Sequence, residues 1–303
     1  MSIRLVGIEE HFLGRVFNEG EPSSREAAQL KMFPGIQQYI ADLGEARIAM
    51  MDRGAMDIQV LAEAVKASKG WLRGFGLLSM AEVDAIPAEL ERCVKDMAFV
   101  GAQIPNHAEG VFYDGREYWP MFAKAQELDV PIYFYPTIPT ELEMKGAAGD
   151  YDQVATKLIS GAAWGWHMSV GYHMLRLYCA GVFDAYPRLK IVIGHNGEGL
   201  PFMLDRIHRF FSKRWTKGKP QRDWLTVWNE NFWVTTAGMF HLGPLQCVLA
   251  MCKSDRILYS LDYPFEDPEE GFQFMKSFQE SGMVSQEQFE KICHGNAERL
   301  LRL

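Results

Sequence analysis

The sequence predicts an α/β protein in which residues 1–303 form one domain, a (β/α)₈ barrel of the TIM type. Eight short β-rich runs alternate with longer helical patterns, which is typical of βα units and a parallel sheet. Runs such as KIVIG (190–194) and RILYSL (256–261) are nearly continuously apolar, as expected of parallel strands covered on both faces. The number of runs and the chain length fit a barrel better than a doubly wound sheet.

The elements follow one another in a regular order. Strands are expected at residues 3–10, 57–62, 74–79, 99–105, 130–136, 190–195, 232–237 and 256–262. Helices are expected at residues 43–54, 85–97, 117–129, 163–183, 199–211, 243–252, 268–282 and 286–303. No internal repeat, low-complexity segment or long linker interrupts this order, which favours a single domain.

Composition excludes several classes of function. The net charge of -8 argues against nucleic-acid binding, which requires a basic face. The five cysteines are odd in number and none has CxxC spacing, so neither a disulfide framework nor a thiolate zinc site is expected. The N-terminus has no signal-peptide pattern, and His167, His173 and Arg176 interrupt the longest apolar stretch. A cytoplasmic protein without a membrane span is therefore expected.

Polar residues follow several of the expected strands at their carboxyl ends. In a barrel of this type the chemistry is located at that end, where the loops after all the strands meet. The residues concerned are Glu9, Glu10 and His11 after the first strand, Asn106 and His107 after the fourth, His195, Asn196 and Glu198 after the sixth, and Asp262 after the last. The sequence therefore predicts an active site at this mouth of the barrel.

Glu9 and His11 are separated by one residue in the first expected strand. Residues two apart in a strand point to the same side, so both side chains can face the barrel mouth. A carboxylate and an imidazole side by side are two ligands of a divalent metal site. The alternative is a salt bridge or hydrogen-bonded pair that caps the strand.

Asp262 ends the last apolar strand, where a carboxylate can bind a metal or transfer a proton. It could instead cap the following helix, but Asp267, directly before PEE, suits that position better. Asp262 is therefore predicted to have another role.

The segment IVIGHNGEGLPF (191–202) combines a strand, a glycine-rich turn and a helix. Its spacing is GxxGxG rather than the GxGxxG of dinucleotide-binding loops, so a nucleotide site is not expected. Gly194 and Gly197 instead allow a sharp turn that presents His195 and Glu198 together. A histidine held by a carboxylate is typical of a positioned acid, base or metal neighbour.

His167 and His173 lie six residues apart in one expected helix and so do not share a face. We interpret them as core or interface histidines rather than a ligand pair. The aromatic residues Trp164, Trp166, Phe232 and Trp233 are interpreted as packing residues, some of which could line a pocket.

Taken together, these segments resemble the metal-dependent decarboxylases of the amidohydrolase-2 group, which act on substrates such as γ-resorcylate and 2,3-dihydroxybenzoate. The matching residues are 8–12 (IEEHF), 181–207, 229–236, 260–266 (SLDYPFE) and 296–303. The resemblance implies an amidohydrolase-type barrel with one divalent metal, zinc or manganese, and no organic cofactor. It implies metal ligands at Glu9, His11 and Asp262, with His195 beside the metal and supported by Glu198. It also implies a homodimer or homotetramer in which Arg206 reaches a substrate carboxylate across the interface.

The sequence departs from this family at two places. Tyr135 stands where the family has a metal-binding histidine, and a neutral phenol is a poor metal ligand. The stretch between residues 61 and 75 is also shorter than in the family and would leave the pocket either unusually open or differently closed. Three arrangements remain open: His195 replaces the lost ligand, the metal is held weakly, or Tyr135, His195 and Asp262 perform acid–base chemistry without metal.

The predicted function is non-oxidative decarboxylation of a hydroxylated aromatic acid of the salicylate or resorcylate type. Asp262 is expected to protonate the ring carbon that carries the carboxylate, with Arg206, Tyr135 and Asn106 as substrate-binding residues. The alternative is another lyase, a hydratase or a cyclase on the same scaffold, independent of metal because of Tyr135. A two-metal hydrolase is less well supported, since the chain has ExH rather than HxH and no lysine in the strands at 99–105 and 130–136. A non-catalytic barrel kept for binding is the fourth hypothesis.

Overall fold

The computed structural model describes residues 3–8, 49, 53, 56–60 and 72–303. Within these residues the strands are β1 (Leu5–Gly7), β2 (Met56–Val60), β3 (Leu72–Arg73), β4 (Phe75–Leu77), β5 (Gly101–Pro105), β6 (Pro131–Tyr135), β7 (Lys190–Ile193), β8 (Phe232–Thr235) and β9 (Ile257–Leu258). The helix expected at residues 43–54 lies largely outside the described residues.

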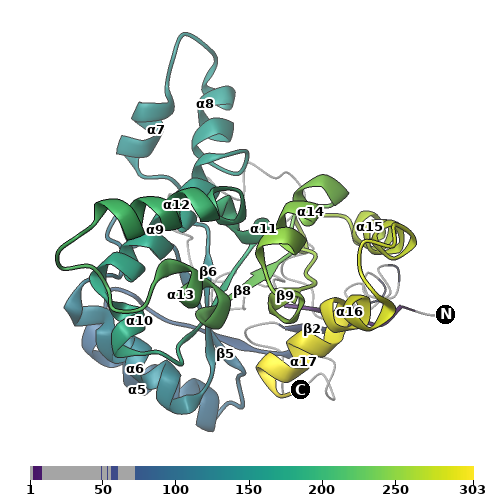
Figure 1. The fold of residues 1–303 in the computed structure, drawn as a ribbon, viewed down its shortest axis with the longest axis horizontal. Coiled ribbons are helices and arrows are strands. Elements are labelled where there is room, and N and C mark those ends of the chain that lie inside the picture. Colours follow the sequence, from purple (N-terminus) through teal and green to yellow (C-terminus); the bar gives the residue numbers. More distant parts are fainter. Residues whose placement is uncertain (1–2, 9–48, 50–52, 54–55, 61–71) are drawn as a thin grey trace, which may run out of the picture.

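Helices lie around these strands (Figure 1). They are α5 (Ile86–Lys95), α6 (Trp119–Leu128), α7 (Glu141–Ala147), α8 (Gln153–Ser160), α9 (Gly165–Ala180), α10 (Val182–Ala185), α11 (His195–Glu198), α12 (Leu200–Arg214), α13 (Trp224–Asn231), α14 (Leu242–Met251), α15 (Pro268–Glu280), α16 (Gln286–Glu290) and α17 (Asn296–Leu301). Short 3₁₀ helices cover Val83–Ala85, Arg116–Tyr118 and Ser254–Arg256, and a π-helical turn covers Lys291–Gly295.

All paired strands in the described part of the chain are parallel. One sheet has the order β1-β2-β3 and the other runs from β4 to β9 in chain order. Gly74 alone separates β3 from β4, so the nine strands occupy eight positions. The π-helical turn contacts both β1 and β9, and its Ile292 carbonyl accepts a hydrogen bond from the backbone N–H of Tyr259. The predicted α/β barrel is confirmed.

The strands bury both of their faces, as parallel strands covered by helices do. On β6, Ile132 and Phe134 belong to the large apolar cluster that includes residues of the surrounding helices, whereas Tyr133 belongs to a second, smaller cluster. Val192, Trp233 and Leu258 of the next three strands belong to the smaller cluster as well. Because side chains alternate along a strand, Tyr135 lies on the same face of β6 as Tyr133.

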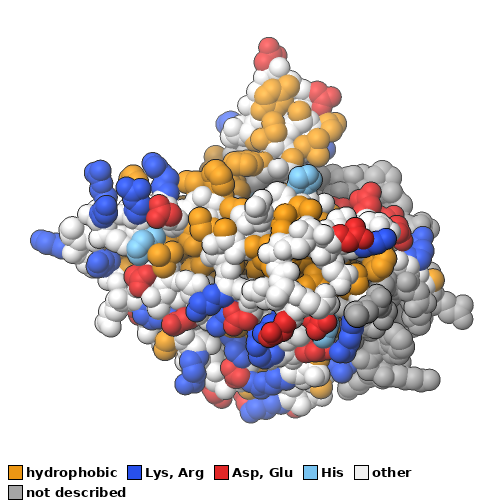
Figure 2. Space-filling view, turned by 45° about the vertical axis from the view of Figure 1, so that its right-hand side comes forward, with side chains coloured by type: hydrophobic (Ala, Val, Ile, Leu, Met, Phe, Trp, Pro, Cys, Tyr) orange, Lys and Arg blue, Asp and Glu red, His pale blue; other side chains and the backbone are white. Residues whose placement is uncertain are grey.

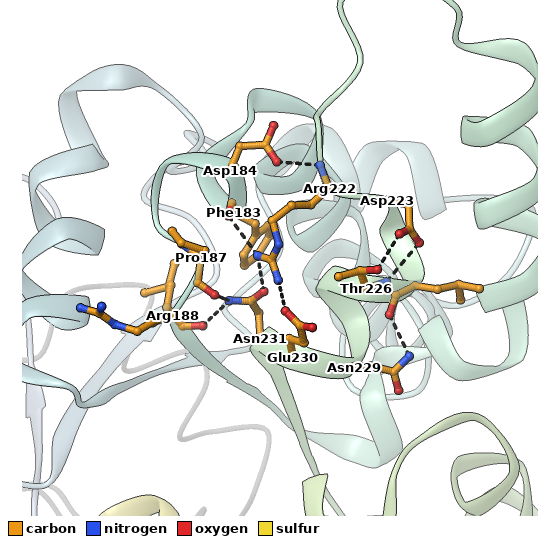
Figure 3. A network of polar contacts seen from close by, with 12 residues as sticks. Phe183, Asp184, Pro187, Arg188, Arg222, Asp223, Thr226, Asn229, Glu230 and Asn231 are labelled. Carbon is orange, nitrogen blue, oxygen red and sulfur yellow. Dashed lines mark hydrogen bonds and ion pairs between the residues drawn. The ribbon is translucent and has the colours of Figure 1, made fainter.

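A group of hydrogen bonds centred on Arg222 and Asn231, called the clasp below, links the chain segments that precede β7 and β8 (Figure 3). The guanidinium donates to the carbonyl of Phe183, the side-chain oxygen of Asn231 and the carboxylate of Glu230. Asn231 is fully buried and donates to the carbonyls of Pro187 and Leu189. The clasp thus joins the segment before β7 to the end of α13, from which β8 continues directly.

Several parts of the chain differ from the expected elements, among them α13, which lies between the expected helix at 199–211 and the expected strand at 232–237. Helices α7 and α8 lie between expected elements and project from the body as a pair (Figure 1). Thr140 and Glu143 form a reciprocal capping box at α7, and the side chain of Asp152 caps α8. The helix expected at 286–303 is divided into α16, the π-helical turn and α17, because a π-helical turn replaces α-helical hydrogen bonding between them.

All five cysteines are free thiols. Among the helices in the described ranges, none combines the length and the apolar composition required to span a membrane.

Candidate active site

A cavity of about 290 Å³ lies beside the carboxyl ends of several strands. This volume is near the lower end of the range for small-molecule sites, roughly 300–1,000 Å³. Its walls combine apolar and ionisable side chains: Tyr135, Ala162, Ala163, Trp166, His167, His195, Gly238, Met239, Asp262, Phe265 and Glu266. The cavity therefore occupies the position at which a barrel carries its chemistry.

The backbone adopts left-handed conformations at non-glycine residues after β7 and again after β9. His195, Asn196 and Glu198 have positive φ angles of 48°, 55° and 54°, and Asp262 has one of 74°. These are four of the eight non-glycine residues with positive φ in the described part of the chain. Such conformations cost about 1–3 kcal/mol each and cluster at functional sites. The expected turn at Gly194 and Gly197 is present, and the structure uses it to bring His195 and Glu198 together.

Glu198 is buried and binds two imidazoles. Its Oε1 lies 2.8 Å from Nδ1 of His195, as the sequence led us to expect, and its Oε2 lies 2.7 Å from Nδ1 of His167. Burial raises the pKa of Glu198, but the charges and hydrogen bonds of the two histidines outweigh this effect and lower the pKa below its ordinary value. The carboxylate form of Glu198 is therefore favoured.

Asp262 faces the other side of the same imidazole. Its Oδ2 lies 3.6 Å from Nε2 of His195, and both side chains are largely buried. Asp267 caps α15 by accepting a hydrogen bond from the backbone N–H of Glu269, which confirms that Asp267 rather than Asp262 caps this helix. Asp262 is thus left at the cavity wall.

Two further side chains complete the polar part of the cavity. Tyr135, at the end of β6, lines it as a strand-end residue should. Glu266 also lines it, and burial together with the neighbouring Asp262 raises the pKa of Glu266 to about 7. A carboxyl group with this pKa is half protonated near neutral pH.

The structure does not bring every expected residue to this cavity. Asn106 is buried, donates to the hydroxyl of Ser169 and accepts at its backbone carbonyl from Nδ1 of His173. This places it beneath α9 rather than in the cavity wall, because it continues the face of β5 that contacts the helices. Glu9 and His11 lie outside the described residues.

Arg206 is exposed on α12, with its guanidinium 4.7 Å from the ring centre of Phe210. It lines a separate basic hollow rather than the cavity of its own chain. The position of Arg206 is thus set by an outer helix and not by a strand end.

Sequence reasoning assigned His173 and His167 alike to packing, and the structure separates them. His173 is fully buried and bonded to the backbone of Asn106 after β5, which confirms the core interpretation. His167, by contrast, lines the cavity. Trp166 is one of the aromatic residues that could line a pocket, and it lines this cavity, whereas nothing in the sequence analysis assigns Glu266 to it. The only signal for Glu266 was its place four residues after Asp262 in SLDYPFE. No sequence signal placed His167, because helical spacing does not show which strand end a helix start will face.

The donor groups at the cavity fit a divalent metal. Nε2 of His195 and a carboxylate oxygen of Asp262 are 3.6 Å apart, close to the roughly 3–3.5 Å between neighbouring ligands of one ion. Imidazole and carboxylate are ligands that zinc and manganese accept. His167, His195 and Glu198 also offer ligand atoms within 4.8 Å of one another, although hydrogen bonds engage the Nδ1 atoms of both histidines.

The mouth of this parallel barrel, where barrel enzymes carry their chemistry, thus gathers a buried Asp–His–Glu series. The sequence pattern of the amidohydrolase family matches residues 24–303, and the chain therefore belongs to that family.

The chain is similar to named proteins along nearly its whole length. It is 40% identical over 329 residues to the decarboxylase orsB of Emericella nidulans, covering 100% of this chain and 98% of that protein. It is 32% identical over 336 residues to the γ-resorcylate decarboxylase of Polaromonas sp., covering 98% of each. A crystal structure of a dihydroxybenzoic acid decarboxylase from Polaromonas sp., with bound manganese and the inhibitor 2-nitroresorcinol, superposes with a TM-score of 0.85 at 28% identity, covering 99% of this chain and 97% of that one.

Proposed function

We propose that this chain is a carboxy-lyase that removes CO₂ from a hydroxylated aromatic acid without oxidation. The observation that carries the proposal is the series Asp262–His195–Glu198 at the wall of the cavity. Full-length similarity to decarboxylases of this substrate class supports it. The apolar walls formed by Trp166, Met239 and Phe265 suit a flat ring, and the acidic and imidazole groups suit its polar substituents.

In the proposed reaction, Asp262 delivers a proton to the ring carbon that carries the carboxylate. The ring loses its aromaticity at this step, and cleavage of the bond to the carboxyl carbon restores it and releases CO₂. The proton then remains on the ring carbon, so that one aromatic carboxylate anion and one proton give one arene and one CO₂. His195, held by Glu198, lies beside Asp262 in a position to return a proton to it.

We propose Glu9, His11, Asp262 and His195 as the residues that would hold a divalent metal, zinc or manganese. When bound, the metal would orient the substrate carboxylate and an adjacent hydroxyl and offset their charge. No organic cofactor is required for this reaction.

The test combines elemental analysis of the purified chain with a screen for CO₂ release. Salicylate and 2,6-dihydroxybenzoate are the first substrates, with benzoate as the control that lacks the ortho hydroxyl. We expect CO₂ from the hydroxylated acids only, and loss of release on treatment with a chelator. Release that resists chelation, with little metal in the protein, would favour a metal-independent lyase, for which Tyr135 in the cavity wall is the supporting observation.

We propose that the chain forms a homodimer or homotetramer through an apolar surface on α7, α8 and α12. Leu142 and Phe202 expose 78% and 81% of their surface, and α8 carries the exposed apolar side chains Val154 and Leu158. Figure 2 shows hydrophobic side chains on the projecting helix pair and on the body below it. Extended apolar patches of this kind mark association sites. Arg206 lies one helical turn after Phe202 and shares its face, so the proposed contact would carry it to a second copy.

Light scattering coupled to size-exclusion chromatography tests the assembly. Phe202→Asp should shift the mass toward that of the monomer. Leu77→Asp changes a residue that is 63% exposed but lies outside this surface, and it should leave the mass unchanged. A monomeric unmodified chain would contradict the proposed assembly without bearing on the chemistry.

We propose a cytoplasmic location, for which the five free thiols give support because disulfides are rare in reducing compartments. Fractionation of the source cells, with the chain detected by antibody, tests this location.

A further inference from the structure

His167 lies on α9, an outer helix, yet its side chain reaches the buried carboxylate of Glu198. Its side chain is 12% exposed and lines the cavity. The ring centres of His167 and His195 are 4.6 Å apart. The single carboxylate of Glu198 therefore lies between two imidazoles, one from a strand end and one from a helix.

The hydrogen-bond partners of His167 decide where its protons lie. Nε2 is 2.8 Å from the carbonyl oxygen of Ala162, and a carbonyl oxygen only accepts hydrogen bonds, so Nε2 carries a proton. Nδ1 is 2.7 Å from Oε2 of Glu198, a contact that requires a proton between the two atoms. Both ring nitrogens are engaged, and in this orientation neither is available to replace the metal ligand missing at Tyr135.

The same reasoning applies to His195. Its Nδ1 lies 2.8 Å from Oε1 of Glu198, so a proton also occupies this contact. Nε2 is then the nitrogen directed at Asp262. The orientation of the Glu198 carboxylate therefore decides which nitrogen of His195 faces the cavity.

Without His167, Oε2 of Glu198 would be a buried carboxylate oxygen that has lost its 2.7 Å partner. A carboxylate left in that state rotates or takes up a proton, and either change alters the contact with His195. The packing of α9 favours this arrangement. At Gly171, one turn after His167, a Cβ atom would lie 2.7 Å from the backbone carbonyl oxygen of Glu198, so only glycine allows the helix to approach so closely.

We infer that His167 is a positioning residue that acts through Glu198 to hold His195 with its Nε2 directed at Asp262 and the cavity. The inference rests on the proposed function for its effect on turnover, but not for its effect on the ring of His195. His167 holds one oxygen of the carboxylate so that the other is oriented toward His195.

Two substitutions separate the contacts of His167. The amide nitrogen of asparagine is the same number of bonds from Cα as Nδ1 of histidine, and that of glutamine matches Nε2. His167→Asn therefore retains a donor for Glu198, whereas His167→Gln retains a donor for the Ala162 carbonyl. A packing role for His167 gives no reason for asparagine to serve better than glutamine.

The direct readout is the ¹⁵N spectrum of the histidine rings in the full chain, recorded without added metal and assigned with a His195→Gln sample. We expect one tautomer of His195, protonated at Nδ1, in the unmodified chain and in His167→Asn, and a mixture in His167→Gln. An unchanged His195 signal in His167→Gln would overturn the inference. This readout requires no substrate, so it stands apart from a failure to release CO₂.

The kinetic readout is a cycle of His167→Gln, Glu198→Gln and the double variant. We expect His167→Gln to lower kcat by about 10- to 100-fold, the usual effect of losing a partner behind a functional histidine, with KM little changed. In the Glu198→Gln background the same substitution should have little further effect, because the carboxylate through which His167 acts on His195 is already absent. Independent, multiplying losses would overturn the inference. If His167→Gln fails to fold, the comparison of His167→Asn with the unmodified chain still tests it, because a mixed His195 tautomer in His167→Asn contradicts it.

Discussion

Nε2 of His195 lies 3.6 Å from Oδ2 of Asp262, although the two residues are 67 positions apart and come from different strand ends. Both residues have positive φ angles, so each turns sharply out of its strand toward the other. Such conformations cost free energy, persist only where the surrounding structure holds them, and cluster at functional sites. The contact is the centre of the proposed acid–base site.

The first prediction concerns Asp262. Asp262→Asn keeps the size of the side chain but removes its acid, so CO₂ release should fall by about 10²–10⁴-fold, the usual contribution of a positioned acid or base. Asp267→Asn is the matched control, since asparagine caps a helix as well as aspartate does and α15 should be unaffected. Full activity in Asp262→Asn would remove the proton donor from the proposal.

Tyr135 supplies the second prediction. Tyr135→His introduces an imidazole at the end of β6 and should raise the affinity for manganese by about tenfold or more, because a neutral phenol is a weak ligand. Tyr135→Phe should give no such gain. Calorimetric titration of the metal-depleted chain measures the difference, and equal affinities in all three proteins would show that the side chain at 135 does not reach the metal.

Gly238 stands behind the contact between His195 and Asp262. A Cβ atom there would lie 3.3 Å from Cδ2 of His195 and 3.7 Å from Oδ2 of Asp262. Gly238→Ala should therefore displace the ring of His195 slightly and lower kcat, in addition to losing about 1–2 kcal/mol of stability from its φ of +61°.

Gly218→Ala is the matched control for Gly238→Ala. Gly218 has a similar φ of +68°, but no atom lies within 4 Å of the added Cβ. The two variants should lose similar stability in denaturant titrations, and only Gly238→Ala should lose activity. Equal activities would show that the site tolerates the added methyl group.

The buried imidazole of His173 should make the free energy of unfolding depend on pH. Its Nε2 accepts from the backbone N–H of Tyr113 and its Nδ1 donates to the Asn106 carbonyl, so the ring is held neutral. Burial lowers its pKa from 6.5 to about 3. As pH falls from 6.5 toward 3, the unfolded chain binds a proton that the folded chain does not, so this contribution is intact above pH 6.5 and is lost at about 1.4 kcal/mol per pH unit below it.

Unfolding in urea between pH 4 and 7 measures this slope, with the pH range set by the pKa of His173. His173→Gln should be less stable throughout, because it loses two buried hydrogen bonds, but its stability should depend less steeply on pH. His208→Gln, on α12, should keep the original slope. An identical slope in His173→Gln would show that another group accounts for the acid sensitivity.

Asn231 predicts a local loss of stability. Asn231→Ala leaves the carbonyls of Pro187 and Leu189 without its two donors and the Arg222 guanidinium without one acceptor, and should cost about 2–3 kcal/mol. Asn229→Ala is the control, because Asn229 donates only within its own helix, to the carbonyl of Leu225 (Figure 3). Thermal unfolding that is equally affected in both variants would contradict a specific role for the clasp.

The sequence by itself determined the alternation of strands and helices apart from α7, α8 and α13, because continuous apolar runs and capping residues are local signals. It also indicated the pairing of His195 with Glu198, which depends on a turn of four residues, and the separation of Asp262 from the capping role of Asp267. Helices α7 and α8 are not among the expected helices, although Thr140 with Glu143 and Asp152 are local capping signals for them.

Only the tertiary structure decided which distant side chains meet. Asn106 and Asp262 both follow strands, yet one faces the helix layer and the other the cavity, because a single residue of register or a bend at the strand end reverses the side on which a side chain emerges. His167 reaches Glu198 because Gly171 lets α9 approach the 195–198 turn. The spacing of residues along one helix carries no information about the distance between that helix and a strand end.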